Sequence, residues 1–174
     1  MGKLAVSVIL AVIFCCVCGC AVLGRKYVEK EMGYSIRPPA NWVESTPDRG
    51  HRNIKEFVSP HLSEERLRSS LNIVVEDADL QIEEYVEKQK NEVLPRSEGF
   101  ELLAEEPVEI GKRWRLVYRL SEAKTGERIV CFQDTIVEQG KVYVLRFIAS
   151  EVQWERMKET FALSADTFKV KRKQ

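Results

Sequence analysis

The first twenty residues of the chain contain most of its cysteines and so limit the disulfides that could stabilise the rest of the chain. After Lys3 comes an apolar run that ends in Val17-Cys18-Gly19-Cys20. A basic start, an apolar stretch and a small residue before a cysteine are typical of a secretory signal segment. This segment contains four of the five cysteines, so Cys131 alone is left for the folded part. We therefore expect no internal disulfide, and a domain that depends on a hydrophobic core.

The end of the run resembles a bacterial lipobox, in which the last cysteine is acylated and becomes the mature N-terminus. Val17 and Gly19 fit this motif, whereas Cys18 departs from the small residue that is usual there. The motif predicts a lipoprotein signal peptide over 1–19 and a lipidated N-terminus and spacer over 20–31. Cys20 would carry acyl chains such as palmitate and hold the protein at a membrane of the cell envelope. Because Ala21 is not the aspartate that retains lipoproteins at an inner membrane, we favour an outer membrane if the cell has one.

An uncleaved membrane anchor is the alternative for the same segment. Leu4 to Leu23 contains no charged residue, and about 20 apolar residues suffice to span a bilayer. Arg25 and Lys26 follow directly, so the distribution of positive charge does not fix the orientation. The lipoprotein interpretation is favoured because a spanning segment gains nothing from ending in Gly-Cys.

Length and charge indicate one domain that does not bind nucleic acid. The chain has 174 residues, and 27 Lys and Arg balance 27 Asp and Glu. Phosphate backbones require a basic surface, which this balance does not provide. We assign residues 32–170 to a single domain and 171–174 to a basic tail, because no linker or repeat interrupts the chain.

Hydrophobic periodicity predicts an α+β fold with an antiparallel sheet flanked by helices. Strands are expected over 34–37, 54–58, 68–77, 101–110, 113–120, 128–138 and 142–149. A first helix is expected from Leu80, capped by Asp79 and closed by Pro95, with an inward stripe at Ile82, Val86, Gln89 and Val93. A second helix should follow the capping box formed by Ser150 and Gln153. Cys131 is predicted to be a buried strand residue rather than a reactive thiol.

Several short motifs resemble those of the PsbP-like domains, a family that includes bacterial DcrB-type lipoproteins. These motifs are Gly33-Tyr34-Ser35-Ile36-Arg37-Pro38-Pro39, Asn41-Trp42-Val43, Phe57-Val58-Ser59-Pro60 and Leu71-Asn72-Ile73-Val74-Val75-Glu76. The resemblance covers about residues 32–170. It implies an α/β/α sandwich that acts as a binding or assembly module, without a shared set of catalytic residues. We expect no cofactor, because neither His51 nor His61 matches the metal site of the photosynthetic members.

A basic strand face is the first candidate site. Arg113, Arg115 and Arg119 alternate with apolar residues, and Arg128 and Arg146 are expected on neighbouring strands. Such a face is often solvated and paired with glutamates. The alternative is that this basic face docks the acidic residues of a helix or binds an anionic partner. Trp42, Trp114 and Trp154 are expected to anchor the core.

Metal binding and hydrolytic catalysis are weaker candidates. His51, His61, Glu64 and Glu65 are metal-ligand types, but their spacing fits no compact motif. Ser59, Ser63 and Ser69 lie near these histidines, without a nucleophile-elbow motif.

The sequence therefore predicts a membrane-tethered, non-catalytic module with an envelope protein partner and an unknown ligand. The alternative is an envelope enzyme of the hydrolase type, or a metal-binding protein, using a cleft near His51 and His61.

Overall fold

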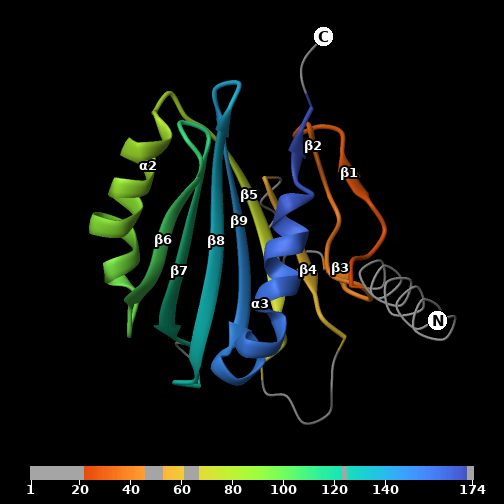
Figure 1. The fold of residues 1–174 in the computed structure, drawn as a ribbon, viewed down its shortest axis with the longest axis vertical. Helices are drawn as coiled ribbons and strands as arrows, with labels where there is room; N and C mark the ends of the chain where they lie inside the picture. Colours follow the sequence, from red (N-terminus) through yellow and green to blue (C-terminus); the bar gives the residue numbers. More distant parts are fainter. Residues whose placement is uncertain (1–21, 46–52, 61–66, 123–124, 172–174) are drawn as a thin grey trace, which may run out of the picture.

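A seven-stranded antiparallel sheet lies at the centre of the computed structural model, which describes residues 22–45, 53–60, 67–122 and 125–171 (Figure 1). Its strand order is β3-β4-β5-β9-β8-β7-β6. The strands are β3 (Val43–Ser45), β4 (Ile54–Val58), β5 (Ser70–Asp77), β6 (Glu101–Glu109), β7 (Arg113–Ser121), β8 (Arg128–Glu138) and β9 (Lys141–Ser150). Strands of this sheet that follow one another in the sequence are paired, except β5 and β6. The chain leaves the sheet after β5 to form the first helix, and β5 pairs with β9 instead of β6.

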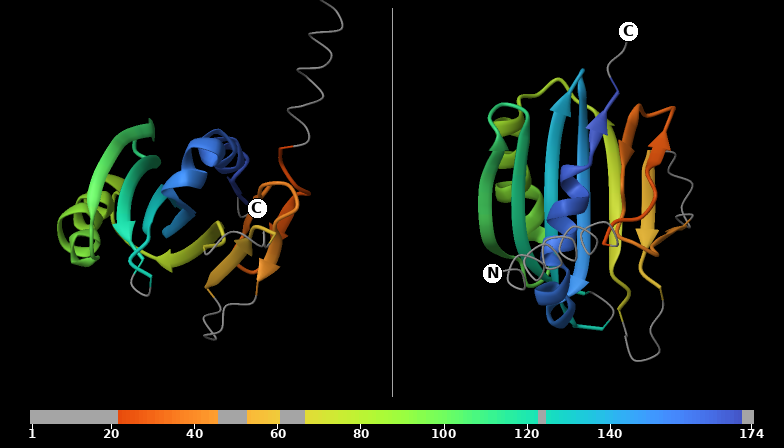
Figure 2. Two further views of the ribbon diagram at one scale, coloured as in Figure 1. Left: turned by 90° about the horizontal axis from the view of Figure 1, so that it is seen from below. Right: turned by 45° about the vertical axis from the view of Figure 1, so that its right-hand side comes forward.

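A helix on each face gives the molecule its layers (Figure 2). Helix α2 (Ile82–Lys88) packs on one face, where Ile82 and Val86 meet Leu116 and Tyr118 of β7. Helix α3 (Glu151–Asp166) covers the other face together with a three-stranded sheet of β1 (Tyr27–Glu29), β2 (Tyr34–Ile36) and β10 (Lys169–Val170). The expected α+β fold, with an antiparallel sheet flanked by helices, is confirmed.

The larger hydrophobic cluster lies between the central sheet and α3. Phe161 of α3 is fully buried, and its ring stacks on Phe147 of β9 at a centroid distance of 4.9 Å. Trp42 and Trp154 pack against this cluster, whereas Trp114 packs on the α2 side. All three tryptophans therefore contribute to core packing while remaining half-buried.

The capping box at the start of α3 is confirmed. The Gln153 N–H donates to Ser150 Oγ and the Ser150 N–H donates to Gln153 Oε1, each at 3.3 Å. Two of the N–H groups that every helix start leaves unpaired are satisfied in this way.

Helix α2 begins later than expected and ends differently. Asp79 does not cap it, because Gln81, whose backbone is extended, is the N-cap and the helix begins at Ile82. A π-helical segment (Gln89–Val93) and a 3₁₀ turn (Leu94–Arg96) follow α2. The wider π turn shifts the inward stripe by one residue, so Leu94 is buried at 4 % exposure and Val93 is exposed at 42 %. The inward position expected for Val93 is therefore wrong.

The N-terminal segment is also more structured than expected. Residues assigned from the sequence to a spacer include β1, which pairs antiparallel with β2. Upstream of β1, the Gly24 N–H donates to the Pro38 carbonyl at 2.7 Å and the Ala40 N–H donates to the Val22 carbonyl at 2.9 Å. These hydrogen bonds place residues 22–24 directly against the turn at Pro38-Pro39.

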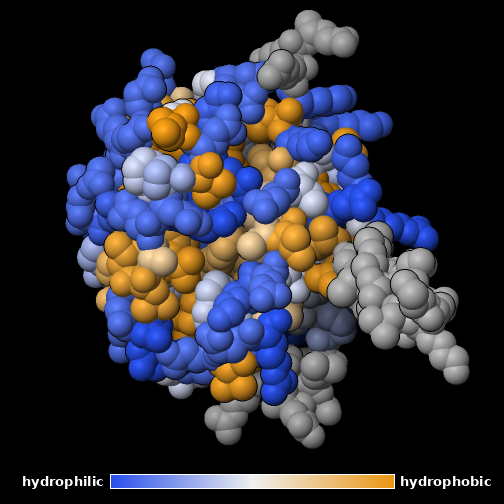
Figure 3. All heavy atoms as spheres, viewed as in Figure 1, coloured by the Kyte–Doolittle hydropathy of each residue, from blue (hydrophilic) through white to orange (hydrophobic). Residues whose placement is uncertain are grey.

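Strand β6 forms one edge of the central sheet and is exposed throughout. It exposes Leu102, Leu103 and Val108, and apolar side chains are visible among charged ones on this side of the molecule in Figure 3. Two register shifts interrupt its pairing with β7, and Pro107 removes one N–H donor. Irregular edges of this kind disfavour pairing with a strand from another chain.

The burial difference between Leu94 and Val93 gives a direct test of the π turn. We expect Leu94→Ala to lower the free energy of unfolding by about 2–4 kcal/mol, because it leaves a cavity under the helix. Val93→Ala should change it by less than about 0.5 kcal/mol. Urea denaturation of both variants measures this, and equal losses would contradict the shifted stripe.

Candidate functional site

The arginines of β7 lie on the sheet face that α3 covers. The strand alternates, so Leu116 and Tyr118 point toward α2, and Arg113, Arg115 and Arg119 point the other way. Register with β8 places Arg115 opposite Asp134. The arginine-lined strand face predicted from the sequence is therefore an internal surface between the sheet and α3.

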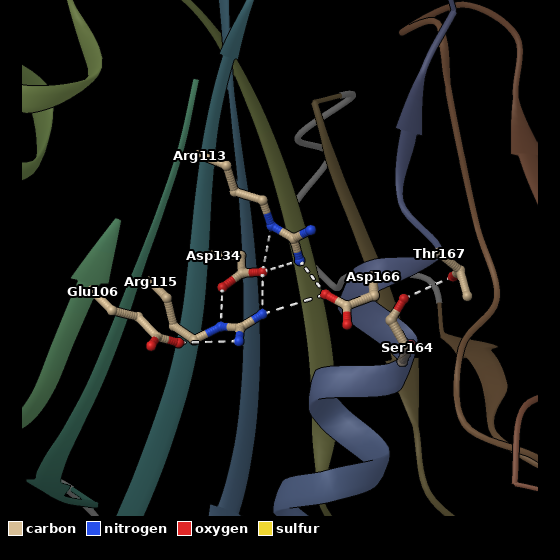
Figure 4. A network of polar contacts seen from close by, with 7 residues as sticks. All are labelled: Glu106, Arg113, Arg115, Asp134, Ser164, Asp166 and Thr167. Atoms are coloured by element: carbon tan, nitrogen blue, oxygen red, sulfur yellow. Dashed lines mark hydrogen bonds and ion pairs between the residues drawn. The ribbon is translucent and has the colours of Figure 1, made fainter. Parts of the chain in front are cut away.

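Asp134 is the centre of this cluster (Figure 4). Its side chain is fully buried, with 0 % exposure. Arg115 donates from Nε to Asp134 Oδ1 at 2.8 Å and from Nη2 to Oδ2 at 3.1 Å. Arg113 donates from Nε to Oδ2 at 2.8 Å and also pairs through Nη2. Four hydrogen bonds from two guanidinium groups thus satisfy one buried carboxylate, which would otherwise be costly to desolvate.

Helix α3 supplies a second carboxylate to the same arginines. Asp166 Oδ1 lies 3.1 Å from Arg113 Nη2 and 3.5 Å from Arg115 Nη2. Arg115 is also placed over the Phe132 ring, with its Cζ atom 4.6 Å from the centroid. Burial by itself would lower the pKa of Arg115, but hydrogen bonding to Asp134 and the charge of Asp134 outweigh it and raise that pKa. The cluster therefore also links the end of α3 to the sheet.

The remaining arginines are divided between the two faces. Arg119 pairs with Glu101 of β6 and with Glu151 of α3, and Arg128 lies 3.4 Å from the same Glu101. Arg146 lies on the α2 face instead, where its Nη2 donates to Gln133 Oε1 at 2.9 Å. Acids of the sheet and of α3 thus occupy the positions where an anionic partner would bind Arg113, Arg115 and Arg119.

The candidates for hydrolytic or metal chemistry are only partly covered by the described residues. Ser69 donates from Oγ to Gln153 Oε1 at 2.9 Å, and the Ser59 N–H donates to the Ser69 carbonyl. The other candidates, His51, His61, Ser63, Glu64 and Glu65, lie outside the residues that the structure describes. Among the described residues, no three His, Cys, Asp or Glu side chains lie close enough to hold a metal ion.

Cys131 is a buried strand residue of the α2-side cluster, with 1 % exposure. Burial raises the pKa of its thiol to about 11. The thiolate is the nucleophilic form, so at neutral pH this cysteine is held in its unreactive state.

A hollow of about 840 Å³ lies where the described chain begins. Leu23 to Tyr27 form one side of it, and residues from Arg37 to Glu44 form the other, with Phe57 of β4. Sequence analysis named Pro38-Pro39, which form the turn, only within a family motif, and it named Trp42 only within another motif and as a core anchor. The hollow was missed because it arises from the docking of residues 22–26 onto that turn, for which the sequence carries no periodic signal.

Cations line this hollow, and they differ from the arginines of β7. Arg25, Lys26 and Arg37 are exposed, and within the described part of the chain their side chains form no ion pair. Glu44 is the acid in the lining, and it lies 3.3 Å from Lys55 Nζ. The last turn of α3 fixes the Arg37 backbone, because Thr167 Oγ1 accepts from its N–H and Ser164 Oγ donates to its carbonyl.

Asp134 and Asp166 allow a test of the arginine cluster. We expect Asp134→Asn to lower the free energy of unfolding by about 3–5 kcal/mol, since it leaves two half-buried guanidinium groups without their buried partner. Asp166→Asn, at a side chain with 58 % exposure, should cost less than about 1 kcal/mol. Thermal and urea unfolding of the two variants measure the difference. Similar losses for both would show that the buried carboxylate does not anchor the cluster.

Alkylation tests the protection of Cys131. At pH 8 we expect iodoacetamide to leave this thiol unmodified in the folded protein and to modify it fully in urea, because the raised pKa and burial both suppress attack. Peptide mass spectrometry reports the site. Rapid labelling of the folded protein would show that the thiol is accessible and ionised.

Solved structures show how this fold recurs among proteins of low sequence identity. The cyanobacterial PsbP protein CyanoP of Synechocystis sp. PCC 6803 aligns with a TM-score of 0.61 and 19 % identity, over 86 % of this chain and 93 % of that one. LpqN of Mycobacterium tuberculosis, which is involved in cell envelope biogenesis, aligns with a TM-score of 0.61 and 14 % identity, over 85 % and 90 %. The Ran-binding protein Mog1p of Saccharomyces cerevisiae aligns with a TM-score of 0.59 and 14 % identity, over 84 % and 94 %. No curated protein matches the chain.

The family assignment rests on the sequence match. The PsbP family model matches residues 24–170, which is nearly the whole of the described domain. The match begins in the segment that docks against Pro38-Pro39, and it ends in β10, the last strand. The chain belongs to the PsbP family.

Proposed function

We propose that this protein is a lipoprotein of the bacterial cell envelope, tethered through acyl chains on Cys20, which acts there as a non-catalytic binding or assembly module. The family match supports this, as does the shared fold with LpqN, a protein involved in cell envelope biogenesis. Mog1p, which has the same fold, binds the protein Ran. A protein partner in the envelope is therefore part of the proposal.

The observation that carries the proposal is the docking of residues 22–24 against the folded domain. Val22 and Gly24 are hydrogen-bonded to the turn that contains Pro38-Pro39, and Leu23 forms an isolated bridge with Pro39. The cysteine of the lipobox-like motif stands two residues before Val22. A lipid on Cys20 would thus hold a folded domain directly at the membrane surface. Among the described residues, no helix is long and apolar enough to cross a membrane.

The arginine cluster supports a module without catalytic chemistry. Its polar groups are engaged with one another, since Asp134 accepts from two arginines and Asp166 adds a second carboxylate. A catalytic site needs polar groups that converge on a substrate instead. In this proposal Arg113, Arg115 and Arg119 hold α3 in place, and the envelope partner is bound by another surface.

Intact mass of the membrane-extracted protein tests the tether. We expect a mass equal to residues 20–174 plus acyl chains, and metabolic labelling with palmitate. Cys20→Ala should abolish both the label and the processed mass, because the acylated sulfur is lost. Cys18→Ala is the matched control, since it removes a cysteine from the same segment and should leave processing intact.

An unprocessed mass of the wild-type protein, without a palmitate label and with full membrane retention, would contradict the lipoprotein. It would instead show that the run from Leu4 to Leu23 remains as a spanning anchor. Loss of the palmitate label in Cys18→Ala but not in Cys20→Ala would assign the lipidation to Cys18 instead.

A further inference from the structure

The cations around the hollow where the described chain begins form no ion pair with any described residue. Arg25 and Lys26 precede β1, and Arg37 follows β2, yet all three line the same hollow. The cations of β7 form ion pairs with Asp134, Asp166, Glu101 and Glu151. Three cations line this hollow against a single acid, Glu44, and a hollow with such an excess of positive charge suits an anion.

The acid that lines the hollow with these cations is paired with another residue. Glu44 lines the same hollow, but its Oε1 lies 3.3 Å from Lys55 Nζ, and the Tyr27 hydroxyl donates to it at 3.5 Å. Lys55 also pairs with Glu29 at 3.5 Å. Lys55 compensates the charge of one of these two carboxylates, so the three cations Arg25, Lys26 and Arg37 still exceed the acid charge left on this side.

The path of the chain places the hollow next to a membrane. Leu23 and Gly24 line it, and the apolar run ends immediately upstream. The two steps from Cys20 to Val22 span at most about 7 Å when fully extended. The hollow therefore lies within reach of lipid headgroups, whether Cys20 is acylated or the run spans the bilayer.

The walls of the hollow suit the membrane interface as well as an anion. Trp42 and Tyr27 are among the lining residues, together with Pro38 and Phe57. Tryptophan and tyrosine are enriched where membranes meet water, because one part of each ring system is apolar and another is polar. Guanidinium groups bind phosphate oxygens in a bidentate manner, and lysine adds a point charge.

We propose that this hollow binds the phosphate headgroup of an anionic membrane lipid through Arg25, Lys26 and Arg37, with Trp42 and Tyr27 at the interface. The bound headgroup fixes the orientation of the tethered domain. The proposal rests on the attachment at the N-terminus described above, and it adds a lipid class and a binding site. The side of the molecule with α2, at the opposite end of the sheet in Figure 1, then faces away from the membrane and is available to a partner.

Hydrogen exchange of the full processed protein in nanodiscs tests the site. We compare discs of phosphatidylcholine with discs that also contain phosphatidylglycerol, and follow backbone amides of residues 22–29 and 37–45. With phosphatidylglycerol we expect exchange in these segments to slow by roughly a hundredfold, about fivefold for each cation. High salt should reverse the effect, because screening weakens attraction to anionic headgroups.

Two triple variants with the same change in charge provide the control. Arg25→Gln/Lys26→Gln/Arg37→Gln should lose the slowing, whereas Lys88→Gln/Arg96→Gln/Lys169→Gln should keep it. The residues changed in both are exposed, so the folded state should be retained, and melting temperatures verify this.

Three results would overturn the proposal. These are equal exchange in the two kinds of disc, slowing that persists in the first triple variant, and slowing reproduced by inorganic phosphate in phosphatidylcholine discs. The last would assign the site to free phosphate instead of lipid. The mass of the same sample reports separately on Cys20, so failure of the lipoprotein proposal and failure of this one are distinguishable.

Discussion

The contact between Phe161 and Phe147 is the one on which the rest of the structure depends. Phe161 is fully buried on the sheet, and the rings of Trp42 and Trp154 lie 6.0 and 6.3 Å from it. This contact sets the position of α3 along its whole length. The last turn of α3 then places Asp166 beside the arginines of β7, and Ser164 and Thr167 against the Arg37 backbone. Packing at one aromatic cluster thus positions both the arginine cluster and one side of the hollow.

Two groups of cations on this scaffold have different physical roles. The arginines of β7 lie between layers, where an unpaired charge would be expensive, and a fully buried carboxylate compensates them. Arg25, Lys26 and Arg37 lie at the surface, where water solvates them and no internal acid is needed. Charge that is compensated internally stabilises a fold, and charge left in solvent remains available for binding. This difference is the reason for separating the structural role of the first group from the lipid site proposed for the second.

Sequence analysis predicted the regular elements better than the irregular ones. Alternation in β7 and the capping box of α3 are local patterns, so they were read correctly from Arg113 to Leu120 and from Ser150 to Gln153. The inward position of Val93 was wrong, because a π turn changes the helical period without a signal in the residues themselves. Strand β1 was missed, since three residues are too few to show a period of two, and its pairing with β2 forms it.

The sequence by itself determined the α+β fold class, the membership of the PsbP family and the presence of an arginine-lined strand face, because each follows from residue order along short segments. Only the tertiary structure decided what those arginines contact. Their partners Asp134, Asp166 and Glu151 are far away in the chain and are brought close by strand pairing and by the packing of α3. The same holds for the hollow. Arg25 and Arg37 line the same hollow because the N-terminal segment hydrogen-bonds to the turn at Pro38-Pro39, which no local pattern in the sequence encodes.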